Sequence, residues 1–120
     1  MNVHTLSEEW ISAQTHNKRD GEFNHWSVDH VIMLHIDKKF EELWSFIKVT
    51  YSKNLPEKVF GNLSAGAMED LLSGAGEEYL EKIEYLAEED PKFKELLSGV
   101  WQNDMSDELW AKVQNLVTKS

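Results

Sequence analysis

The chain has 120 residues, of which 41% are hydrophobic and 28% charged, and this size and composition predict one globular domain over residues 1–120. It contains no cysteine, which excludes disulfides, thiol catalysis and thiolate metal sites. A formal net charge of −10 opposes binding to nucleic acid or to an anionic membrane surface, and it favours a basic protein partner.

Apolar residues at helical spacing predict three helices in the first half of the chain. Thr5 opens a capping pattern for a helix over about residues 6–16, and a polar loop with an Asp-Gly pair follows over residues 17–22. Ser27 is expected to cap the second helix, and Asp37 to start the third. The third helix has the clearest buried face, formed by Phe40, Leu43, Trp44, Ile47 and Tyr51.

Residues that end or cap helices divide the second half into shorter elements. They are Pro56, Gly66, Ser73, Gly74, Asp90, Pro91, Gly99 and Ser106. The resulting helices include a short segment over residues 68–72 and a longer helix over residues 76–90, and no stretch shows the alternation typical of a strand. We therefore expect an all-α fold, a compact single-domain bundle of about seven or eight short helices.

The histidines do not form a metal-binding pattern. His25, His30 and His35 follow at five-residue intervals, and each interval turns the side chain by about 140° around a helix. Metal ligation from one helix needs intervals of three or four, so these side chains splay apart. Asp29 lies four residues after His25, but two ligands make a weak site, and we expect neither a metal nor another cofactor.

Glu69 and Asp70 are the best candidates for acid–base catalysis, because apolar neighbours can exclude water from a carboxylate and raise its pKa. A polar cap or a solvated edge of a helix explains the same pair, and we favour that interpretation. The sequence also lacks a phosphate-binding loop, a nucleophile elbow, a zinc-protease motif and a calcium loop. No catalytic residue is predicted, and the protein is expected not to be an enzyme.

The helix over residues 76–90 carries the most informative surface pattern. Four glutamates fall within an arc of about 60° on a helical wheel, with a tyrosine on its shoulder. We call these five residues the acidic face: Glu77, Glu81, Glu84, Tyr85 and Glu88. Like charges four residues apart each cost roughly a few tenths of a kcal/mol in an isolated helix. The acidic face is therefore either a solvated surface or a docking surface for a basic partner.

Several short motifs lie between residues 40 and 113. They are FEELWSFI at 40–47, GAMEDLL at 66–72, IE at 83–84, DPKF at 90–93, GVW at 99–101 and WAKV at 110–113. Together they resemble an uncharacterised bacterial family of all-helical domains of unknown function. The resemblance implies an all-α fold and a bacterial cytoplasmic setting, and it supplies no catalytic residues. Trp101 and Trp110 are prominent in the shared pattern, and we interpret both as packing residues.

Small size, acidity and the lack of cysteine also make the chain similar, more loosely, to the immunity proteins that neutralise basic bacterial toxins. The first functional hypothesis is therefore a non-enzymatic protein-binding module, most concretely an immunity protein against a cationic toxin domain. The alternative is a regulatory or scaffold domain that binds a peptide or small ligand in an apolar groove near Trp101 and Trp110. An enzyme that uses Glu69 or Asp70 comes third. Because no signal peptide or run of about 18 apolar residues is present, we expect a cytoplasmic protein.

Overall fold

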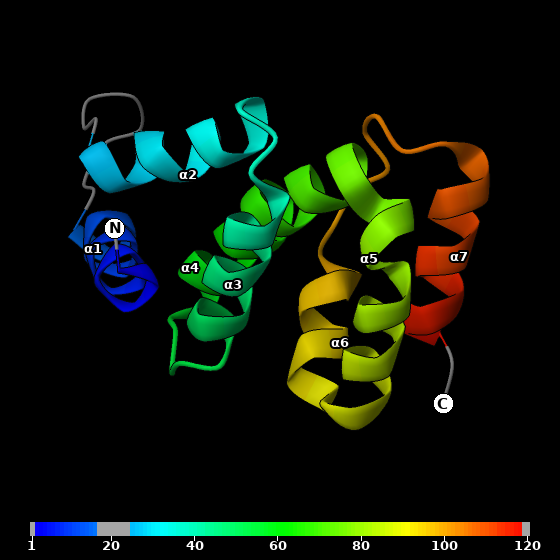
Figure 1. The fold of residues 1–120 in the computed structure, drawn as a ribbon. Coiled ribbons are helices and arrows are strands. Elements are labelled where there is room, and N and C mark those ends of the chain that lie inside the picture. The colour runs from blue at the N-terminus through cyan, green and yellow to red at the C-terminus, as the bar shows by residue number, and fades with distance from the viewer. Residues whose placement is uncertain (1, 17–24, 119–120) are drawn as a thin grey trace.

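The computed structural model describes residues 2–16 and 25–118, and all of their regular structure is helical (Figure 1). The elements in chain order are α1 (Val3–His16), α2 (Trp26–Ile36), α3 (Phe40–Tyr51), α4 (Glu57–Leu63), the π-helix η1 (Ser64–Met68), α5 (Glu69–Glu89), α6 (Pro91–Ser98) and α7 (Asp107–Thr118). The predicted all-α class is therefore confirmed. The loop expected over residues 17–22 lies outside the described residues. In the part of the chain that the structure describes, none of the helices combines the length and apolar character needed to cross a bilayer.

Two groups of helices lie at opposite ends of the molecule (Figure 1). Helices α1 and α2 contact each other at one end. Helices α5, α6 and α7 stand together at the other end, and each of them contacts the other two. Helix α3 lies between the groups and contacts members of both, so its buried face is the centre of the hydrophobic core.

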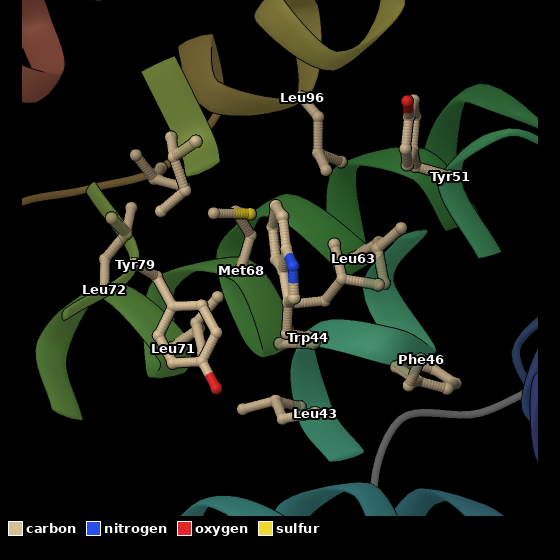
Figure 2. Packing of buried hydrophobic residues seen from close by; sticks show 14 of the residues in the cluster. Leu43, Trp44, Phe46, Tyr51, Leu63, Met68, Leu71, Leu72, Tyr79 and Leu96 are labelled. Atoms are coloured by element: carbon tan, nitrogen blue, oxygen red, sulfur yellow. The ribbon is translucent and has the colours of Figure 1, made fainter. Parts of the chain in front are cut away.

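The buried face of α3 is made mainly of apolar residues at helical spacing, but it includes Phe46, which was not predicted, while the predicted Phe40 is only partly buried. Its fully buried members are Leu43, Phe46 and Ile47. Trp44 packs edge-on against Phe93 of α6, with ring centroids 5.8 Å apart. Figure 2 shows its indole between the side chains of Leu63 and Met68. Burial of one such large side chain contributes roughly 1.5–3 kcal/mol, so α3 holds the two groups of helices together.

The first two helices are capped by residues other than those predicted. Helix α1 begins before Thr5, because the side-chain oxygen of Asn2 accepts the N–H of His4 at 2.8 Å. Helix α2 is capped by His25, whose Nδ1 accepts the N–H of Ser27 at 3.2 Å. In both helices a side chain that precedes the predicted cap accepts the N–H of a residue in the first turn. The helix therefore begins earlier than predicted.

The junction between α2 and α3 also differs from the prediction. Asp37 is the C-cap of α2 and not the start of the next helix, and Lys38 has a φ of 60°. A left-handed conformation costs a residue with a side chain roughly 1–2 kcal/mol. No glycine marks this turn in the sequence, and α3 begins only at Phe40.

A continuous helical path runs from α4 through η1 into α5. The prediction that Gly66 ends a helix is wrong, because the backbone widens into the π-helix and continues. A π-helix accommodates an additional residue within a turn instead of breaking the helix. A Cβ atom at Gly66 would meet no atom within 4 Å, so this glycine faces open space.

The segment predicted over residues 68–72 and the helix predicted over residues 76–90 are two parts of α5. They meet at a kink at Ala75, which has a φ of −147° and a ψ of 25°. A Cβ at Gly74 would lie 2.5 Å from Phe40 Cζ, and a Cβ at Gly76 would lie 2.5 Å from Leu109 Cδ2. The two glycines therefore let α3 and α7 approach the bend closely.

The starts of α6 and α7 agree with the sequence prediction. Asp90 Oδ1 accepts the N–H of Lys92 at 3.0 Å, and Pro91 occupies the first position of α6. Ser106 Oγ accepts the N–H of Leu109 at 3.1 Å. These caps fix where each helix begins, and they leave residues 99–106 to connect α6 to α7.

Candidate functional site

The acidic face lies on the open side of the second half of α5. All five of its members are exposed: Glu77, Glu81, Glu84, Tyr85 and Glu88. Tyr79, Ile83 and Ala87 on the opposite side are buried, and their packing fixes the rotation of the helix about its axis. Tyr85 is 66% exposed and lies at the edge of the arc of glutamates. The glutamates and the tyrosine therefore form one accessible surface.

A lysine of α7 compensates the first residue of the acidic face. Lys112 Nζ lies 3.8 Å from Glu77 Oε2 and 3.5 Å from Glu108 Oε1. All three side chains are exposed to solvent, and an ion pair of this kind contributes roughly 0–1 kcal/mol. This end of the face is consequently less negative than a count of its glutamates suggests.

The middle of the acidic face has no such compensation. Lys82 lies on the same helix, but its Nζ is 5.2 Å from the centroid of the Tyr79 ring, on the side away from the glutamates. Among the described residues, neither Glu81 nor Glu84 forms an ion pair with a lysine or an arginine. These two carboxylates remain available to a cation from outside the chain.

Glu69 has a structural position that the sequence did not reveal. Its side chain is 8% exposed, so the expectation of a polar helix edge is wrong for this residue. Oε1 accepts the backbone N–H of Trp101 at 3.0 Å, and Oε2 accepts Nδ2 of Asn103 at 2.9 Å. Both oxygens therefore hold the connection between α6 and α7 in place.

Asp70 has a different environment from its neighbour. Its carboxylate is half-buried, and Oδ2 lies 3.9 Å from Nδ1 of His35. Burial raises the pKa of Asp70, the charge of His35 lowers it, and the charge of Glu69 raises it again. Unlike a fully exposed residue of a polar helix edge, Asp70 therefore has a raised pKa that comes mainly from its partial burial.

A small pocket opens beside Asp70 where α1, α2, η1 and the start of α5 meet. Its volume is about 330 Å³, within the lower range of small-ligand sites. Its wall is largely apolar, with Asp70 as its charged residue: Trp10, Gln14, Val28, Val31, Ile32, Asn62, Ala65, Gly66, Ala67 and Asp70. A wider groove of about 870 Å³ lies elsewhere, between α1, α2 and α3.

One side of α2 exposes large apolar residues. They are Trp26, Ile32, Met33 and Ile36, with 43–59% of each residue exposed. The opposite side of the helix buries Ser27, Val31 and Leu34. Apolar residues therefore surround most of this helix, a pattern typical of a helix that is buried on all sides or meets a partner. The sequence contains this pattern, but helical spacing alone does not show which side of the helix stays uncovered.

The histidines take separate positions in the structure. His25 caps α2, while the ring of His30 lies 6.5 Å from that of Trp26 in an edge-on arrangement. His35 faces Asp70. Over residues 2–16 and 25–118, no three histidine or carboxylate side chains are grouped so that they could hold a metal ion.

Trp101 and Trp110 differ in their surroundings. Trp110 is half-buried and packs against the core, in agreement with its interpretation as a packing residue. Trp101 is 73% exposed, so that interpretation is wrong for Trp101. Neither tryptophan lines the pocket beside Asp70 or the wider groove.

A protein-family model described as a family of unknown function, DUF6869, matches residues 14–120. The chain belongs to this family. The matched region includes α2 to α7, and therefore the acidic face, Asp70 and the exposed residues of α2. The predicted resemblance to an uncharacterised domain family is confirmed. No curated protein and no solved structure matches the chain.

Two features of the described part of this DUF6869 member are open to solvent and carry carboxylates. The acidic face presents carboxylates that attract cations at long range. The pocket beside Asp70 presents one carboxylate within apolar walls, an arrangement in which a cationic group is held by charge and its hydrocarbon part by burial.

Proposed function

We propose that this DUF6869 member is a non-enzymatic protein-binding module that docks a basic protein partner on the acidic face of α5. The observation that carries the proposal is the exposure of Glu81 and Glu84 without a cationic partner among the described residues. A basic protein would replace the repulsion between these carboxylates with attraction, and the net charge of −10 would speed its encounter.

Tyr85 supplies an aromatic contact, which the charges of the glutamates alone cannot provide. Interfaces gain much of their affinity from a few aromatic anchors, and an exposed tyrosine beside the carboxylates meets this requirement. A toxin domain with a basic surface is the most concrete partner of this kind, and the protein would then act as its immunity protein in the cytoplasm. The charge argument holds equally for another basic protein.

Crosslinking from within the acidic face tests the proposal directly. A photoreactive phenylalanine derivative at position 85 is expected to capture a basic protein in the producing cells. The same derivative at Ser52, an exposed residue at the end of α3, is the control. Capture of the same proteins from both positions would contradict docking at this face.

The captured partner then allows a kinetic test. Glu81→Lys with Glu84→Lys is expected to slow association by about tenfold or more at low salt and to reduce its dependence on salt. Glu8→Lys with Glu95→Lys makes the same change of net charge at exposed positions of α1 and α6, and a smaller effect is expected. Equal effects of the two double variants would show that net charge matters and the acidic face does not.

A further inference from the structure

The exposed apolar residues of α2 form a continuous stripe along the helix. On a helical wheel of about 100° per residue, Ile32, Ile36, Met33 and Trp26 fall within an arc of about 120°. From Trp26 to Ile36 this apolar stripe extends along the helix for roughly 15 Å. Exposed apolar patches of a few hundred Å² mark interaction sites in soluble proteins.

The apolar stripe is continuous with the pocket beside Asp70. Ile32 belongs to both, because it lines the pocket and is 46% exposed on the stripe. Val28 and Val31 of the same helix form the pocket wall behind it. The two features are therefore one surface, an apolar stripe that leads into a pocket with a carboxylate.

The charges on this surface favour a basic occupant. Asp29 is exposed within the arc of the stripe, and Asp70 lines the pocket. Lys38 and Lys39 lie beyond the end of α2 and line the separate groove towards α1 and α3. A second copy of the chain fits less well, because twofold pairing of α2 would bring Asp29 and Asp70 of two chains with a net charge of −10 together.

We propose that the apolar stripe and the adjoining pocket dock an amphipathic helical segment of a basic protein, with apolar side chains on α2 and a lysine or arginine of the partner beside Asp70. The proposal rests on the proposed function in assuming a basic partner, but it assigns the contact to another surface. A helix lying along α2 would match the length of the stripe, and one cationic side chain would suit the volume of the pocket.

The test uses a fluorescein-labelled helical peptide of leucine and lysine, about 15 residues long, with leucines on one face. Fluorescence anisotropy with the full chain is expected to show saturable binding. A peptide with glutamate in place of each lysine is expected not to bind. Equal binding of the two peptides would overturn the assignment of a basic occupant.

Variants of the stripe and the pocket locate the contact. Ile32→Ser with Ile36→Ser is expected to weaken binding by about tenfold or more, and Asp70→Asn by about fivefold. Gly66→Leu fills the pocket and is expected to weaken binding about tenfold, whereas Gly61→Leu, at a glycine that likewise has nothing within 4 Å of its Cβ, is the matched control. Unchanged binding by the Ile32 and Ile36 variant, with an unchanged circular dichroism spectrum, would overturn the proposal.

Two further measurements separate this proposal from its alternatives. Sedimentation of the free chain is expected to show a monomer, and a dimer that the Ile32 and Ile36 variant abolishes would assign the stripe to a second copy. Glu81→Lys with Glu84→Lys is expected to slow association of the peptide and to leave its dissociation rate unchanged. If that variant leaves association unchanged while the α2 variants weaken binding, docking at the acidic face fails and the contact at α2 stands.

Discussion

Helices α5 and α2 each leave one side open to solvent, and the two open sides have opposite chemistry. The open side of α5 carries glutamates with Tyr85 at their edge, whereas the open side of α2 carries large apolar side chains with Asp29 among them. Attraction by carboxylates acts over about 8–10 Å and weakens with salt. Burial of apolar surface acts at contact and is not screened. A basic partner could therefore be attracted by one helix and retained by the other.

The largest expected contrast is between two isoleucines, one on the inner side of α5 and one on the open side of α2. Ile83 is fully buried, and Ile83→Ala is expected to lower the free energy of unfolding by about 2–5 kcal/mol. Ile36 is 59% exposed, and Ile36→Ala is expected to change the free energy of unfolding by less than about 0.5 kcal/mol. Urea unfolding followed by circular dichroism measures both. A large loss for Ile36→Ala would mean that this side of α2 is packed and not open.

Two glutamates of α5 are expected to differ less in their contribution to the free energy of unfolding. Glu69→Ala leaves the N–H of Trp101 and the amide of Asn103 without their acceptor, and we expect a loss of about 2 kcal/mol in the free energy of unfolding. Glu81→Ala removes the same atoms from the exposed face, and we expect a change within about 0.5 kcal/mol. The same urea experiment compares the two variants, and similar losses would contradict the anchoring role of Glu69.

The sequence was sufficient for features that depend on neighbouring residues. The caps at Asp90 and Ser106 and the exposed side of α5 follow from local hydrogen bonding and helical spacing, because charged side chains avoid the core unless they are paired. The same helical spacing of apolar residues predicts that α3 is a helix with one buried side.

Other features depend on contacts between distant segments, and local patterns do not encode them. Glu69 is buried because the connection between α6 and α7 supplies its two donors from more than 30 residues away. The residues of α2 likewise do not show which side of the helix stays exposed. An apolar side chain is buried only where another element covers it. The left-handed turn at Lys38 has no glycine or asparagine to indicate it.

The smallest expected effect concerns Asp70 and the pH dependence of stability. Burial raises the pKa of Asp70 in the folded state, so its protonated form favours folding, and this contribution is lost as the pH rises through the folded pKa. Asp70→Asn is therefore expected to have a slightly higher Tm than the wild type at pH 7. The difference should disappear below about pH 3, where the carboxyl group is protonated in both states.

Thermal unfolding across this pH range measures the effect of Asp70→Asn. Asp29→Asn, at an exposed carboxylate of α2, provides the comparison. A Tm difference for Asp70→Asn that is independent of pH would show that its cause is packing and not ionisation.

The π-helix between α4 and α5 holds one residue more than a regular helix along the same path needs. Because the wider turn takes up this surplus residue, the helix beyond it keeps the orientation that it would have without the residue. Deletion of exposed Ala65 is therefore expected to restore an ordinary α-helix and to leave Asp70 beside His35 and the glutamates of α5 on the open side. The extra length between α4 and α5 is thus absorbed locally and does not turn the second half of the molecule.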